Sequence, residues 1–222
     1  MSCLQPPPGP VDLGDADDRW ARDFFSRMLD GRLDAGQFEA AVAARWQGGH
    51  FIGHAPGCAR WLRALALQQS IDAGYGSGAG LGFRSQWLIG EPGRPGVIHI
   101  QAPPERLHSP RLQDKNRVPH MHDSGRVSVI TQGRAVLHVL RRDGDGRSST
   151  LDCPVQEGDL IFWPAWTPHT FDALDGFWLI SAMAAYVAPA ADGFVVPLDD
   201  TGQLDALPRR TYAQHLKDRA DA

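Results

Sequence analysis

Three histidines in this sequence have the spacing of a metal site. His120 and His122 are one residue apart in the segment RVPHMHDSGR, and His169 follows Pro168 much later in the chain. In an extended strand, side chains at positions i and i+2 point to the same face, so His120 and His122 would project together about 6 to 7 Å apart. Imidazole binds zinc, iron, copper and nickel, and a third ligand from a distant strand would leave coordination positions open. The alternative, that these are ordinary loop residues, suits a lone histidine better than three at these spacings.

The sequence around these histidines resembles the two motifs of the cupin superfamily. The first motif, G-x5-H-x-H-x3/4-E-x6-G, is matched by His120, His122 and Gly133. The second, G-x5-P-x-G-x2-H-x3-N, is matched by Gly158, Pro164 and His169. The resemblance covers about a quarter of the chain, and it is fairly specific because several spacings agree at once. It implies a cupin jelly-roll barrel with His120, His122 and His169 as metal ligands.

The chain departs from the two motifs at four positions. Two glycines and an asparagine are replaced by Asp114, Trp166 and Ala173, and Arg126 stands where a ligand glutamate is expected. A guanidinium has no lone pair and stays protonated, so Arg126 cannot replace the glutamate as a ligand. The resulting site would hold three neutral imidazoles and would favour anionic co-ligands. We expect Arg126 to hold a substrate carboxylate in a two-point contact. The alternative is that the strand register slips by one and Arg126 points to solvent.

Cupins with three histidines and no glutamate resemble non-haem iron dioxygenases. The resemblance therefore implies an Fe(II) enzyme that uses O₂ on a small carboxylated substrate, aromatic or derived from an amino acid. The segment GDLIFWPAWTPH is also similar to JmjC-type 2-oxoglutarate oxygenases, but these use His-x-Asp/Glu, and His122 replaces that acid. A redox-neutral zinc, manganese or nickel lyase, isomerase or cyclase is a second possibility, and a non-catalytic binding protein is a third.

Other residues near the motifs are weaker candidates. Trp163 and Trp166 flank Pro164 on the approach to His169, where they could bind a planar substrate or simply fill the barrel. Arg84 and Gln86, in the first strand after the glycine-rich stretch, are further candidates for substrate binding.

The remaining histidines and the cysteines support no further site. Two histidines in alternating strands, His99 and His138, could point inward beside the metal or outward to solvent, and we favour an ordinary structural role. Four others have no partner spacing, namely His50, His54, His108 and His215. Cys153 is expected to be a small buried apolar residue, and the three cysteines have no spacing that favours a disulfide framework or a thiolate zinc site.

The elements that position these residues divide the chain into five parts. Residues 1–14 are a proline- and glycine-rich lead-in, and residues 15–73 contain three helical patterns, with Asp34 as a cap and Pro56 in a first turn. Residues 74–82 form a glycine-rich linker, because the stretch lacks the Lys-Ser/Thr of a phosphate-binding loop. Short alternating strands separated by turns over residues 83–190 predict an antiparallel barrel. Residues 191–222 are an extension with a short strand, FVVP, and a last helix.

Composition excludes some classes of partner. The 222-residue chain is 42 % hydrophobic and has a formal charge of −4, so it has no basic excess to hold a phosphate backbone. No stretch resembles a membrane span or a signal peptide. We expect a cytoplasmic homodimer that binds neither nucleic acid nor membrane. The predicted fold is mainly β, a cupin-type double-stranded β-helix barrel with an N-terminal helical segment.

Overall fold

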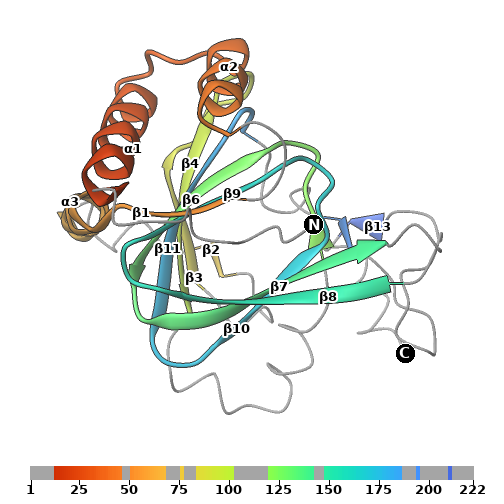
Figure 1. Cartoon of the computed structure of the whole chain (residues 1–222). Coiled ribbons are helices and arrows are strands. Elements are labelled where there is room, and N and C mark those ends of the chain that lie inside the picture. The colour runs from red at the N-terminus through yellow and green to blue at the C-terminus, as the bar shows by residue number, and fades with distance from the viewer. Residues whose placement is uncertain are drawn as a thin grey trace.

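A computed structural model describes eight segments of the chain, residues 13–46, 51–68, 76–77, 84–102, 120–142, 148–186, 194–195 and 210–211. Three helices precede most of the strands, α1 Leu13–Leu29, α2 Ala35–Arg45 and α3 Pro56–Gln68. The predicted cap of α2 is confirmed: Asp34 accepts a hydrogen bond from the backbone N–H of Gln37, whose side chain accepts from the N–H of Asp34. All three predicted helical patterns form helices. The helices lie together on one side of the barrel (Figure 1).

Two antiparallel sheets form the barrel. The first has the order β1-β9-β6-β11-β4-β3-β2. Its strands are β1 Phe51–His54, β2 Gly76–Ser77, β3 Arg84–Ile89, β4 Gly96–Ala102, β6 Arg126–Gln132, β9 Asp159–Trp163 and β11 Phe177–Met183. The second has the order β13-β12-β5-β10-β7-β8. Its strands are β5 His120–Met121, β7 Arg134–Arg142, β8 Ser148–Gln156, β10 His169–Ala173, β12 Phe194–Val195 and β13 Arg210–Thr211.

The chain passes back and forth between the two sheets. From β4 onward it enters the second sheet at β5, returns at β6, forms the β7–β8 pair in the second sheet, and then alternates through β9, β10 and β11. This winding, with every pair antiparallel, is a double-stranded β-helix, the jelly roll that the resemblance to cupins implied. The predicted fold class, a mainly β jelly-roll barrel with an N-terminal helical segment, is confirmed.

The two faces of the first sheet carry different cores. Along β6, Val127 and Val129 pack in a cluster with the helices, where Trp46 stacks on Phe162 with ring centroids 5.0 Å apart. Ile130 belongs to a second cluster with Leu137 and other residues of the second sheet. The first cluster therefore lies between the outer face of the sheet and the helices that cover it. The second cluster lies in the barrel interior.

Strand β1 was not predicted, because FIGH is too short to show an alternating pattern and lies within the segment expected to be helical. It pairs antiparallel with β9, with Ile52 opposite Ile161. Asp17 of α1, which is 2 % exposed, accepts a hydrogen bond from the backbone N–H of His54 at 3.1 Å and forms an ion pair with Arg45 of α2. The N-terminal segment thus joins the barrel through a strand as well as through helix packing.

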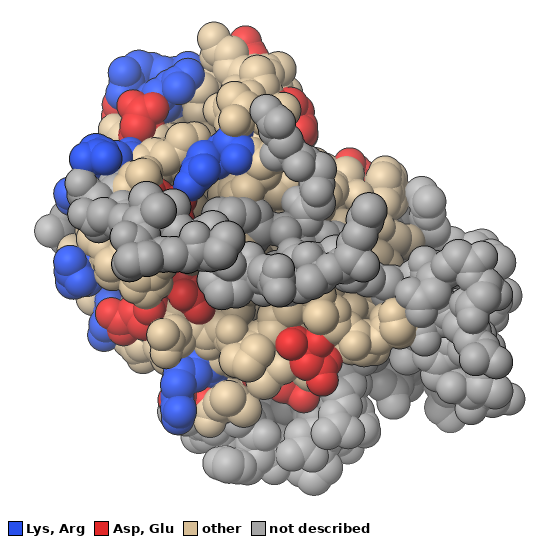
Figure 2. Space-filling model, viewed as in Figure 1, with Lys and Arg blue, Asp and Glu red and all other residues tan. Residues whose placement is uncertain are grey.

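Some predictions concern residues outside the described segments. Residues 1–12 of the lead-in predicted over 1–14 are among them, whereas Leu13 and Gly14 are already the first residues of α1, so the lead-in is shorter than predicted. Most of the segment 209–222, within which the last helix was predicted, is also outside, and its described residues Arg210–Thr211 form β13. Most of the glycine-rich stretch is outside too, although Gly76–Ser77 pairs with β3. The short strand predicted at FVVP is present as β12. In the described part of the chain, no helix is both long and apolar enough to cross a membrane. On the face of the molecule shown in Figure 2, basic and acidic side chains are interspersed over the side where the helices lie.

Candidate metal and substrate site

Four of the predicted site residues come together at one end of the barrel, namely Arg126, Trp163, His122 and His169. Arg126 is the first residue of β6 and is paired with Trp163, the last residue of β9. His169 is the first residue of β10 in the opposite sheet, and its imidazole lies 4.5 Å from the Trp163 ring, centroid to centroid. The contact joins the two sheets across the barrel interior. Segments that are distant in the sequence therefore meet at this end.

His122 and His169 approach each other closely. Their ring centroids are 5.3 Å apart. His120 is the direct cross-strand partner of His169 in the β5–β10 pair, and its side chain lies outside the described residues. Among the described side chains, no three His, Cys, Asp or Glu residues come together as a metal site.

The imidazole of His169 is fixed by its backbone surroundings. It is 1 % exposed, and its Nδ1 lies 2.8 Å from the carbonyl oxygen of Thr167. Because a carbonyl oxygen only accepts, Nδ1 carries the proton and Nε2 carries the lone pair. A histidine that donates one ring N–H to a backbone carbonyl is held in the tautomer and orientation that metal ligation requires.

Arg126 points into the barrel. Along β6, Arg126 and Ser128 share a face with Ile130, which belongs to the interior cluster, and they alternate with Val127 and Val129 on the helix-covered face. Arg126 is 2 % exposed. The register places its side chain on the interior face, so the alternative of a slipped strand with Arg126 in solvent does not describe this structure.

Two serines that the sequence analysis missed lie on the same interior face. The hydroxyl of Ser128 on β6 donates to that of Ser181 on β11 at 2.8 Å, and both side chains are buried. The signal was present in RVSVITQ, because a serine two residues after Arg126 must share its face. Its significance depended on knowing which face looks into the barrel.

Trp163 and Trp166 occupy different environments. Trp163 is 4 % exposed and belongs to the interior cluster. Trp166, in the loop between β9 and β10, is 40 % exposed and has a φ of 61°. Its backbone N–H donates to the carbonyl oxygen of His122 at 2.7 Å. Trp166 thus links the loop that precedes His169 to the segment of His122, with its side chain at the rim of the barrel.

Gln86 and Arg84 lie away from this end of the interior. Gln86 is paired with His99, and His99 with Ile180, which belongs to the helix-side cluster. The Gln86 side chain is therefore on the opposite face of the sheet from Arg126. Arg84 is placed only by its backbone, opposite Gln101.

His99 and His138, which the sequence allowed to point either inward or outward, both lie outside the barrel interior. His99 is 1 % exposed on the helix-covered face, and burial lowers the pKa of its imidazole to about 4. It contacts the Trp178 ring edge-on at 5.6 Å. His138 is on the outer face of the second sheet, with Asp152 2.7 Å from Nδ1 and Asp172 3.2 Å from Nε2. The structural role favoured for both residues fits these positions.

Comparisons with known proteins find solved structures that are similar in fold but low in sequence identity. No protein-family model and no curated protein matches the chain. Among solved structures, oxalate decarboxylase from Bacillus subtilis is 20 % identical over 51 % of this chain and 27 % of its own, with a TM-score of 0.37. A variant of salicylate 1,2-dioxygenase from Pseudoaminobacter salicylatoxidans is 14 % identical over 56 % and 33 %, with a TM-score of 0.35. Vicilin from Solanum melongena is 18 % identical over 41 % and 24 %, with a TM-score of 0.33.

The chain spans about a third or less of the length of these structures. TM-scores below 0.5 support no inference about activity, so the fold assignment rests on the strand order described above.

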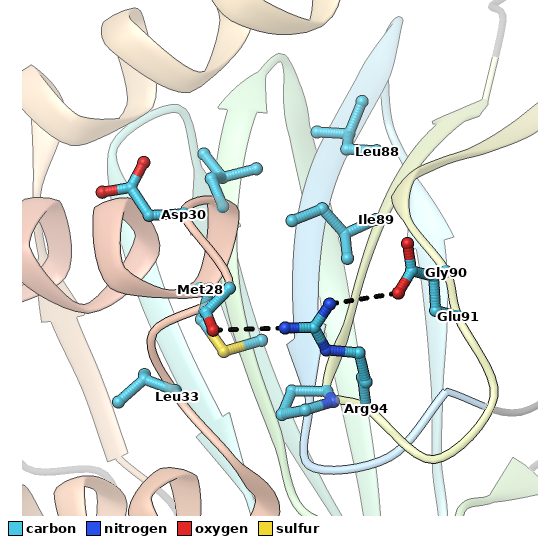
Figure 3. A pocket seen from close by; sticks show the side chains of 11 residues that line it. Met28, Asp30, Leu33, Leu88, Ile89, Gly90, Glu91 and Arg94 are labelled. Atoms are coloured by element: carbon cyan, nitrogen blue, oxygen red, sulfur yellow. Dashed lines mark hydrogen bonds and ion pairs between the residues drawn. The ribbon is translucent and has the colours of Figure 1, made fainter.

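A pocket of about 390 Å³ lies elsewhere, between the C-terminal end of α1 and the turn that joins β3 to β4 (Figure 3). Its wall combines apolar side chains such as Met28 and Leu88 with the acidic residues Asp30 and Glu91. Its one guanidinium, on Arg94, is paired with Glu91 at 3.1 Å and reaches the carbonyl oxygen of Gly31 at 3.5 Å. None of the predicted site residues lines this pocket, so we assign it no chemistry.

Proposed function

We propose that this chain is a metal-dependent enzyme of the non-haem iron oxygenase or dioxygenase class, with His120, His122 and His169 as ligands. The observation that carries the proposal is the pair of imidazoles of His122 and His169, together with buried Arg126 on the strand position opposite Trp163, whose ring contacts His169. A metal ion bound by two imidazole nitrogens at about 2.1 Å, with a bond angle between about 90° and 110°, holds the ring centroids about 4.5 to 5.3 Å apart. The observed 5.3 Å fits that arrangement.

The histidines supply a neutral ligand set. With Nδ1 of His169 donating to Thr167, the lone pair is on Nε2, which is the atom that would bind a metal ion. His120 is directly opposite His169, and opposed residues in an antiparallel pair have Cβ atoms about 4.5 to 5.5 Å apart. We therefore keep His120 as the third ligand. Iron(II) in such a site supplies open coordination positions and the redox chemistry that dioxygen requires.

Arg126 binds and orients the substrate in this proposal. Its guanidinium is buried on the interior face next to Trp163, so a small carboxylate that enters this end of the barrel meets a desolvated positive charge. A two-point contact fixes the direction in which the substrate extends from its carboxylate. Apolar side chains from both sheets flank this end of the barrel and would exclude water from the rest of the substrate.

Metal analysis tests the ligand set. We expect purified protein to carry about one first-row transition metal per chain, and His122→Ala or His169→Ala to lose most of it. The matched control is His54→Ala, because His54 is about half exposed and lies on the N-terminal side of the barrel. A double variant at His122 and His169 that retains full metal occupancy would contradict the site.

Reaction class and substrate charge need a second measurement. The iron(II) protein, prepared without oxygen, should bind nitric oxide, and it should consume oxygen with a carboxylated substrate, whereas zinc-loaded protein should be inactive. Arg126→Lys should lower kcat/KM about ten- to a hundredfold with metal content unchanged, because an ammonium does not reproduce the planar contact. Turnover by zinc protein under anaerobic conditions would instead assign the chain to the lyases or isomerases.

A further inference from the structure

The indole N–H of Trp163 is a buried donor whose hydrogen bond is not made within the described part of the chain. Trp163 is 4 % exposed, and its Nε1 has no partner there. The ring packs against two rings of one strand, the imidazole of His169 at 4.5 Å and the ring of Phe171 at 5.8 Å between centroids. Both neighbours belong to β10 in the opposite sheet. The donor therefore lies inside the barrel at the same end as the histidines.

Such a donor needs an explanation, because leaving a buried N–H unsatisfied costs free energy that an apolar side chain of similar size would avoid. Elsewhere in the same interior cluster, apolar residues such as Ile130 and Leu179 fill the space at no such cost. The position opposite Trp163 in β6 is Arg126, so two donor side chains stand next to each other on one face. Ser124, two residues before Arg126, has a buried hydroxyl that also lacks a partner among the described residues.

We propose that the Trp163 indole N–H donates a hydrogen bond to a second acceptor oxygen of the substrate, next to the carboxylate held by Arg126. This inference rests on the proposed function, which supplies the carboxylate. An indole N–H only donates, so it accepts no hydrogen bond from the ligand and favours a carbonyl or another acceptor oxygen at that point. The substrate class is accordingly a small acid with an acceptor oxygen near its carboxylate, such as a 2-oxo acid. A simple aliphatic acid leaves the N–H unsatisfied.

The test uses pyruvate and propionate as probes, because they differ in whether the second carbon carries a carbonyl oxygen or two hydrogens. Zinc-loaded full-length protein, labelled with ¹⁵N in its seven tryptophans, gives one indole N–H resonance per ring. Trp163→Phe assigns the resonance of interest. Pyruvate should move that resonance downfield, and propionate should leave it nearly unchanged. Absence of binding by pyruvate at millimolar concentration, or a Trp163 resonance that does not respond at saturation, overturns the proposal.

A binding comparison gives a second readout. Trp163→Phe should raise the Kd of pyruvate about tenfold and leave that of propionate unchanged, so discrimination between the two acids is reduced. The control is Trp178→Phe, because the Trp178 ring contacts His99 on the helix-covered face of the first sheet, outside the barrel interior. Equal weakening of both acids, or the same effect in Trp178→Phe, contradicts a specific hydrogen bond.

Metal content measured in the same samples separates the two proposals. Wild-type protein that binds no metal refutes the proposed function. Metal-loaded protein that binds pyruvate while its Trp163 indole resonance stays in place refutes only the role of Trp163.

Discussion

The glycines of the two motifs have backbone roles rather than chemical ones. Gly133, at the tight connection between β6 and β7, has a φ of 76°, and Gly158, between β8 and β9, has a φ of 93°. Side chains rarely adopt such values. A Cβ on Gly133 would lie 2.2 Å from the carbonyl oxygen of Gly176. The two motif glycines are therefore needed at turns, and these turns fix the positions of the strands that carry the predicted ligands.

Gly133→Ala should destabilise the protein strongly. The substitution combines an unfavourable φ with a collision against backbone, so we expect a loss on the order of 2 to 4 kcal/mol in the free energy of unfolding, measured by urea denaturation. Gly93→Ala is the matched control, because Gly93 has a φ of 80° but nothing within 4 Å of the added Cβ. It should lose only about 1 kcal/mol. Equal losses in the two variants would show that the contact with Gly176 is unimportant.

Trp166 stands where the motif has a glycine, and its φ of 61° explains why a glycine is usual there. The strained backbone is held in part by the hydrogen bond from its N–H to His122. Trp166→Gly removes the side chain and the strain together, whereas Trp166→Val removes the ring but places a β-branched residue at the same φ. We expect Trp166→Val to be less stable than Trp166→Gly by about 1 to 2 kcal/mol in thermal or urea denaturation. Equal stabilities would mean that the loop relaxes to a negative φ.

At the scale of elements, the helices over the outer face of the first sheet bury strand residues that would otherwise be exposed to solvent. His99 alternates normally along β4, but it lies beneath this layer and is 1 % exposed. Burial favours the neutral imidazole, which lowers its pKa from 6.5 to about 4. In the unfolded chain the same group takes up a proton near its ordinary pKa.

The pH dependence of stability follows from this difference. Below about pH 6.5 the unfolded state binds a proton that the folded state does not bind until about pH 4, so His99 should lower stability as the pH falls through this window. The full effect is on the order of 3 kcal/mol. His99→Gln should lose less stability between pH 6.5 and 4 in urea titrations at several pH values. A His99→Gln variant with the wild-type slope would exclude His99 as the cause.

At the scale of the whole molecule, the helical segment and the barrel share elements. Two neighbouring carboxylates of α1 make the connections: Asp17 accepts from the backbone N–H of His54 in β1, and Asp18 accepts from the N–H of Cys58 in α3 at 2.6 Å. Cys58 itself is buried, and burial raises the pKa of its thiol to about 12, which leaves it unreactive. The helices therefore stabilise the barrel from the side opposite its interior.

Asp17→Ala tests this connection. It leaves the backbone N–H of His54 and the guanidinium of Arg45 without the buried carboxylate, so we expect a loss on the order of 3 kcal/mol in the free energy of unfolding. Asp23→Ala is the control, since Asp23 forms an exposed i,i+4 pair with Arg27 on the same helix and should cost less than about 0.5 kcal/mol. Metal content of the folded Asp17→Ala protein should stay unchanged. A loss no larger than that of Asp23→Ala would show that β1 and α2 are held by packing alone.

The sequence by itself determined the features that depend on local spacing. The two motifs predicted that His122, His169 and Arg126 lie at one end of the barrel, and the apolar periodicity and Asp34 predicted the helices. Periodicity states which residues share a face, but not what covers that face. Tertiary packing decided that Arg126 points into the barrel while Gln86 and His99 face the helices. The same reason applies to β1: its four residues form a strand because β9 offers an edge, and no local pattern contains that information.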